Sequence, residues 1–146
     1  MKKRMLASLL LSALLFTLSG CGEKSLLNKK EPISLTFWHV YGEQAGSPMD
    51  LLVQEFNRTV GQERGVQVKV TGTSSASKIG GYLKDAQSGG KDVQEMPDLF
   101  TCHIVDALEL GEDNLVDWNS QFTPSELSDF VPGFLDDGTA EDGRLL

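Results

Sequence analysis

Five polar or aromatic side chains with the chemistry to bind a small polar molecule follow three predicted strands. They are Tyr41, Glu43, Ser75, His103 and Asp106. A carboxylate accepts hydrogen bonds from two hydroxyls at once, serine and histidine donate, and a tyrosine ring offers a flat apolar face. A molecule rich in hydroxyl groups needs this mixture. We therefore expect these residues on the ligand side of a binding site, although ordinary solvated loop charges remain the alternative for Glu43 and Asp106.

Trp38 has two interpretations. Its indole is a possible stacking face for a ligand, but residues in a parallel strand are often buried on both sides of the sheet. The segment 71–78 has no aromatic or acidic residue, so its ligand contacts would come mainly from hydroxyls and backbone. An oligosaccharide, a monosaccharide or another small polar solute fits this composition.

The same part of the sequence also fits a metal site. His39 and His103 are the two histidines of the chain, and both fall at predicted strand ends near Glu43 and Asp106. Two imidazoles and two carboxylates are suitable zinc ligands. No closely spaced ligand pair such as HxxxH is present, so a zinc site would depend wholly on the fold. A zinc-binding surface lipoprotein is the alternative function.

Motifs of catalysis are missing from the sequence. It contains no Gly-x-Ser-x-Gly elbow, no local Cys–His signature and no phosphate-binding glycine loop. Gly80-Gly81 and Gly89-Gly90 are interpreted as turn glycines. We therefore predict a binding protein that is not an enzyme, with no cofactor and no resident metal.

Alternating strands and helices should position these residues. Three apolar segments are interpreted as strands, at 33–39, 66–70 and 99–102. Helices are predicted from Pro48 up to Gly61 or Gly65, over 82–87 and over 105–110. A further helix should begin at the Thr123-Pro124-Ser125-Glu126 capping box and carry Phe130, Val131 and Phe134. This order predicts an α/β fold with an open, mainly parallel sheet and flanking helices.

The N-terminus has the pattern of a secretory signal that ends at Cys21. A basic start, Lys2-Lys3-Arg4, precedes a short apolar stretch, and Leu18-Ser19-Gly20 leads into the cysteine. This ending resembles the lipobox of bacterial lipoproteins, in which the cysteine is lipidated. We predict a signal peptide over 1–20, a lipidated Cys21 with a flexible tether to residue 32, and a lipid-anchored protein on the extracytoplasmic side of the membrane. The formal net charge of −8 disfavours nucleic acid as a partner.

Several segments together resemble one family. They are Ile33-Ser34-Leu35-Thr36-Phe37-Trp38-His39 after the tether, Phe56-Asn57 at a helix end, Pro97-Asp98-Leu99-Phe100, and Leu115-Val116-Asp117-Trp118. Their order resembles the N-terminal portion of extracellular solute-binding proteins of ABC importers, in the sugar-type, maltose-binding-protein-like family.

The resemblance implies a bilobal, periplasmic-binding-protein-like fold with a ligand cleft between the lobes. It also implies a solute, most simply a carbohydrate, that is delivered to a membrane permease. Members of the family have roughly 400 residues, far beyond one domain. We therefore expect residues 33–146 to form a partial N-terminal lobe, and the sequence to be a truncated fragment.

Overall fold

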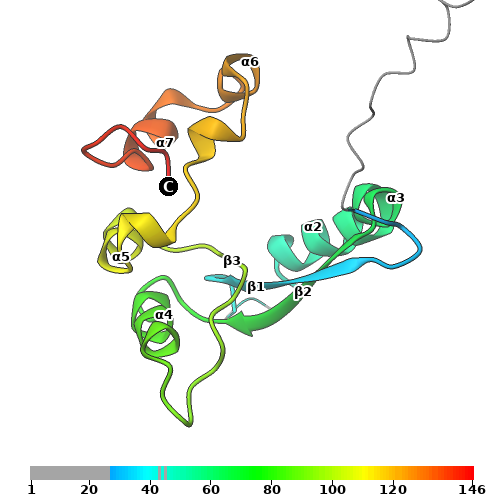
Figure 1. Cartoon of the computed structure of the whole chain (residues 1–146), viewed down its shortest axis with the longest axis horizontal. Helices are drawn as coiled ribbons and strands as arrows, with labels where there is room; N and C mark the ends of the chain where they lie inside the picture. Colours follow the sequence, from blue (N-terminus) through cyan, green and yellow to red (C-terminus); the bar gives the residue numbers. More distant parts are fainter. Residues whose placement is uncertain (1–26, 43, 45) are drawn as a thin grey trace, which may run out of the picture.

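The computed structural model describes residues 27–42, 44 and 46–146. The predictions for the signal peptide, for Cys21 and for the Glu43 side chain lie outside these residues. Figure 1 shows a small sheet with helices on either side and a further group of short helices toward the C-terminus. Among the described residues, no helix is long and apolar enough to cross a membrane.

The sheet has three parallel strands, which confirms the predicted fold class. β1 spans Ile33–His39, β2 spans Val66–Thr73 and β3 spans Leu99–Phe100, in the order β2-β1-β3. The β1–β2 register shifts at Thr71, so that Phe37 pairs with Val70 and Trp38 pairs with Gly72. β2 therefore extends three residues beyond its predicted end, while β3 is two residues shorter than predicted.

Asp98 compensates for the shortness of β3 by holding it to the middle of β1. Its Oδ2 accepts hydrogen bonds from the Thr36 backbone N–H and hydroxyl, both at 2.7 Å. The Asp98 N–H donates to Thr36 Oγ1 at 3.0 Å. The pKa of Asp98 is lowered, first by the Thr36 N–H and then by its hydroxyl, because both donors favour the charged carboxylate.

A helical segment connects β1 to β2. It consists of α2 (Pro48–Phe56), a π-helical turn (Asn57–Gly61) and α3 (Gln62–Arg64). Ser47 caps α2 by accepting a hydrogen bond from the Asp50 N–H, as its place before proline predicts. Gly65 ends the segment with φ of +77°, which a residue without Cβ adopts at little cost.

Helix α4 (Ile79–Ser88) covers the sheet and supplies much of the core. Ile79 and Leu83 are almost fully buried and pack with Trp38, Ala86 and Leu110. The predicted start of this helix at residue 82 was wrong. Gly80 and Gly81 were interpreted as part of a connecting turn, but they lie within the first helical turn of α4.

The remaining elements are short. They are α5 (Ile104–Glu109), 3₁₀ turns at Glu112–Asn114 and Trp118–Ser120, α6 (Pro124–Leu127) and α7 (Pro132–Asp137). Both hydrogen bonds of the predicted capping box at Thr123 and Glu126 are present. The expectation that this helix carries Phe130, Val131 and Phe134 was wrong, because α6 ends before them and Pro132 starts α7. All three side chains are exposed.

Candidate functional site

The carboxyl ends of the three strands are hydrogen-bonded to one another. Val40 N–H, just after β1, donates to Thr101 Oγ1 after β3 at 3.2 Å. Ser74 N–H, after β2, donates to the His39 carbonyl at 3.0 Å, and Gly42 N–H donates to the Ser74 carbonyl at 3.1 Å. The order β2-β1-β3 places the topological switch between β1 and β3. Ligands of open α/β sheets bind beyond the strand ends at such a switch.

His39 positions the loop after β1 from inside the protein. Its imidazole is fully buried, and Nε2 lies 3.2 Å from Asp50 Oδ1 in the first turn of α2. Nδ1 accepts a hydrogen bond from the Tyr41 N–H at 3.2 Å. This bond assigns the proton of neutral His39 to Nε2, which then donates to Asp50. Both ring nitrogens of His39 are therefore used within the protein.

Asp50 is held in its charged form by its neighbours. Its Oδ2 accepts from the Ser47 hydroxyl at 3.0 Å. The pKa of Asp50 is lowered, mainly by this hydroxyl and next by the hydrogen bond from His39. Sequence reasoning identified Ser47 and Asp50 only as parts of a helix start. Their link to His39 could not be read from the sequence, because it depends on how α2 returns to the end of β1.

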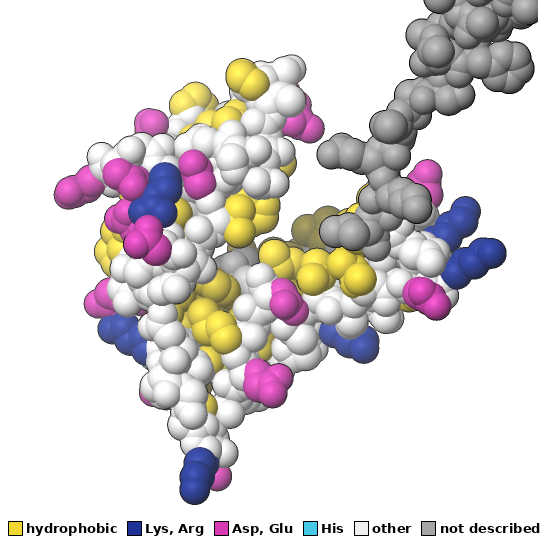
Figure 2. Space-filling model, in the orientation of Figure 1, with side chains coloured by type: hydrophobic (Ala, Val, Ile, Leu, Met, Phe, Trp, Pro, Cys, Tyr) yellow, Lys and Arg dark blue, Asp and Glu magenta, His cyan; other side chains and the backbone are white. Residues whose placement is uncertain are grey.

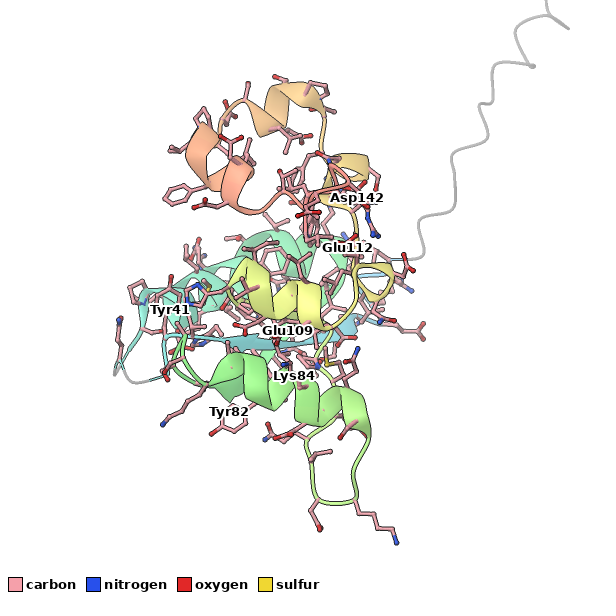
Figure 3. The ribbon with its side chains drawn as sticks, turned by 90° about the vertical axis from the view of Figure 1, so that its left-hand side faces the viewer. Tyr41, Tyr82, Lys84, Glu109, Glu112 and Asp142 are labelled. Atoms are coloured by element: carbon pink, nitrogen blue, oxygen red, sulfur yellow. The ribbon has the colours of Figure 1, made fainter. Side chains whose placement is uncertain are left out.

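Tyr41 and Ser75 lie at the ends of β1 and β2. Tyr41 is 41% exposed, and its ring centroid is 6.1 Å from that of His39. Figure 3 shows Tyr41 beyond the end of β1. The Ser75 hydroxyl is 3.1 Å from the Ser77 hydroxyl, and the Ser75 carbonyl accepts from the Lys78 and Ile79 N–H groups. Both side chains keep hydrogen-bonding capacity at this edge.

His103 and Asp106 lie at the start of α5, after β3. His103 is exposed and is the N-cap residue of α5. Asp106, one turn later, is half-buried, and its carboxylate lies over Gly80 of α4. A Cβ built on Gly80 would be 2.1 Å from Asp106 Oδ1, so only glycine permits this approach. This approach accounts for the glycine at position 80, whereas a Cβ on Gly81 would meet nothing within 4 Å.

Trp38 belongs to the core, which is the second of its two interpretations. It is 5% exposed, and its Nε1–H donates to Thr71 Oγ1 at 3.1 Å. A Cβ on Gly72 would lie 2.7 Å from the indole Cδ1. Thr71, at the register shift, and the adjacent Gly72 therefore create the space that the indole occupies.

A cavity of about 790 Å³ lies between β3, α5 and the C-terminal segment. Many of its lining residues are apolar, including Phe100, Leu115 and Phe134. Cys102 also lines it, and burial, followed by the charge of Asp106, raises the pKa of this thiol to about 11. The thiol is therefore protonated at neutral pH and is a poor nucleophile.

The zinc hypothesis gains no support from the described residues. Among them, no group of three or more histidine, cysteine, aspartate or glutamate side chains is placed to hold a metal ion. His39 is bonded to Asp50 and to the Tyr41 backbone. The fourth expected ligand, Glu43, lies outside the described residues.

No family model matches the sequence, and no curated protein matches it. A solved structure from a study of xylan utilization by the thermophilic bacterium Caldanaerobius polysaccharolyticus has a similar fold, with a TM-score of 0.54 and 21% sequence identity. The alignment covers 77% of this chain and 28% of that chain. This chain thus spans less than a third of that chain's length. Identity this low shows a shared fold alone, which is consistent with part of a periplasmic-binding-protein-like domain.

Proposed function

We propose that this chain is the ligand-binding part of a lipid-anchored solute-binding protein of an ABC importer, with a carbohydrate as its solute. The main support for the proposal is the set of hydrogen bonds that connects the ends of the three strands at the β1/β3 switch. Tyr41, Ser75 and His103 lie close to these strand ends. The fold shared with a protein from a study of xylan utilization makes a plant-type oligosaccharide the first ligand to test.

The proposed mechanism is binding without chemistry. Tyr41 offers a ring face to the sugar, and the Ser75 hydroxyl and His103 imidazole donate to sugar oxygens. Glu43 and Asp106 are the proposed acceptors. The buried His39 holds the Tyr41 backbone in place, so that little ordering of this loop is needed when a ligand binds.

Delivery to a permease is the second part of the proposal. Closure of a second lobe over the strand-end edge would trap the solute by a hinge motion. Lipidation at Cys21 would keep the protein near the permease and raise its effective concentration there. Neither the role of the anchor nor the identity of the permease affects the binding test.

Residue-resolved NMR titration of the full chain with xylotetraose tests the binding site. We expect the amide signals of Tyr41, Ser75 and His103 to shift, and Tyr41→Ala to weaken the response at all of them. Phe134→Ala is the matched control, because this aromatic side chain is 72% exposed on α7, in another part of the molecule. The proposal fails if strand-end signals stay unchanged with xylotetraose, maltotetraose and cellotetraose alike.

A further inference from the structure

A second groove lies between the end of β2, helix α4 and the loop that follows this helix. Its volume is about 510 Å³, within the range of roughly 300–1,000 Å³ that is typical of small-molecule sites. The residues that matter for its chemistry are Trp38, Ser74, Tyr82, Asp85, Asp92 and Gln94. Figure 3 shows Tyr82 on α4 and Tyr41 beyond the end of β1. The lining residues of the groove do not include Tyr41, Ser75, His103 or Asp106, which distinguishes it from the proposed strand-end site.

Most polar side chains of the groove make no hydrogen bonds to other described protein groups. Within the described part of the chain, the Ser74 hydroxyl is buried and has no hydrogen-bond partner. No hydrogen bond or ion pair within that part engages the side chains of Tyr82, Asp85, Asp92 or Gln94. A buried hydroxyl without a partner needs an explanation, and a ligand hydroxyl at this wall would supply one.

The wall of the groove is built into the fold. The register shift at Thr71 brings Gly72 beside Trp38, and the missing Cβ leaves room for the indole. Tyr82 and Asp85 are three residues apart on α4 and therefore share one face of the helix. Ile79, almost fully buried, fixes this helix against the sheet. Helix α4 thus presents Tyr82 and Asp85, whereas Asp92 and Gln94 lie on the loop that follows it.

The mixture of groups determines the class of ligand. Carboxylates of Asp85 and Asp92 accept hydrogen bonds, whereas the Gln94 amide and the Ser74 and Tyr82 hydroxyls also donate. Among the described residues, no lysine or arginine lines the groove, so an anion meets no countercharge from them there. A cation would not use the donors. A neutral polyol uses both donors and acceptors, and the half-exposed Tyr82 ring offers an apolar face.

We propose that this groove is a second carbohydrate site that binds one or two sugar units independently of the strand-end site. The proposal goes beyond the proposed function, because it rests on no residue assigned to the strand-end ligand contacts. Ser74 connects the two regions through its backbone, since it is bonded to His39 and Gly42. Its side chain alone belongs to the groove wall.

The test is an amide-resolved NMR titration of the full chain with xylotetraose, maltotetraose and choline as separate probes. We expect a sugar to shift the signals of Ser74, Tyr82, Asp85, Asp92 and Gln94. Tyr82→Ala and, separately, Asp85→Ala should each weaken this response roughly tenfold or more. Both side chains are exposed on α4, and an unchanged Trp38 indole signal will verify that the core is intact. Tyr41→Ala, the matched aromatic control, should leave the groove response unchanged.

The outcomes separate this proposal from the proposed function. Groove shifts without strand-end shifts would support the second site while contradicting the strand-end site. The second site is overturned if no sugar shifts the groove signals, if choline alone shifts them, or if the response survives both Tyr82→Ala and Asp85→Ala.

Discussion

Residues 33–111 and residues 112–146 are stabilised in different ways. In the first region, parallel strands pair over long sequence distances, and the core contains Trp38, Ile79, Leu83 and Leu110. In the second region, Ala140 is the one buried apolar residue among those described. Figure 2 shows apolar side chains on the visible surface of several elements, including this group of short helices.

Contacts among its own residues hold the second region together. Arg144 bonds Glu112 and Asp142, and its pKa is raised, first by Asp142 and then by Glu112. Backbone bonds link Trp118 to Leu145 and Ala140 to Arg144. Packing against the sheet therefore positions the residues of both proposed binding sites, whereas caps and ion pairs stabilise the C-terminal helices. Substitutions in the two regions should therefore differ in size.

The largest effect is expected from Leu83→Ala. Leu83 is fully buried between α4 and the sheet, so the change leaves a cavity and should lower the free energy of unfolding by about 2–5 kcal/mol. Urea denaturation of the full chain measures this loss. Leu52→Ala on α2 is the control, because Leu52 is 63% exposed and its loss should change stability by less than about 0.5 kcal/mol. Equal effects of the two substitutions would contradict the assigned core.

His39→Ala should have the next largest effect. It leaves the Tyr41 N–H without its acceptor and Asp50 Oδ1 without the imidazole donor, at a cost of about 1–3 kcal/mol. Sugar binding at the strand-end site should weaken as well, because the Tyr41 backbone loses its anchor. Urea denaturation and the NMR titration check the two effects. Unchanged stability would show that the buried imidazole is not a structural anchor.

A smaller effect is expected from Thr123→Ala in the second region. The change removes the two hydrogen bonds of the Thr123 hydroxyl with Glu126 at the start of α6, while the Thr123 N–H still donates to the Glu126 carboxylate, and it should cost about 1 kcal/mol. Hydrogen exchange should speed up within 124–130 and stay unchanged in the strands. Faster exchange in β1 would contradict the idea that α6 is stabilised independently of the sheet.

The smallest effect is the pH dependence caused by Asp50. The folded-state pKa of Asp50 lies below the ordinary value of 3.8, so its stabilising contribution is present above that pH. The contribution is lost as the pH falls through the lower, folded-state pKa. Asp50→Asn should therefore flatten the decline of stability below about pH 4, as measured by urea midpoints across pH. An unaltered decline would assign it to other carboxyl groups.

Local signals in the sequence predicted elements in both regions. Alternation over 33–39, the Ser47-Pro48 helix start and the Thr123 capping box all correspond to observed elements. The start of α4 was missed, because glycine disfavours helices and the close approach of Asp106 to Gly80 is a tertiary contact. The single helix expected after Thr123 is divided in two, because Pro132 begins α7.

The candidate sites were less predictable than the elements. The strand-end positions of Tyr41, Ser75 and His103 follow from the alternation of strands and helices. The role of Asp50 and the second groove depend on residues distant in sequence coming together, as Ser74 and Asp92 do in lining the same groove. No pattern in the sequence brings those residues together.

Hydrogen exchange of the full chain, with and without xylotetraose, is the most direct test of the central claim that the first region carries the ligand sites. The account predicts added protection in the strand-end segments 39–42, 74–79 and 103–106, with no change in 112–146. Protection that appears only in 112–146, or nowhere with any of the tested sugars, would contradict it.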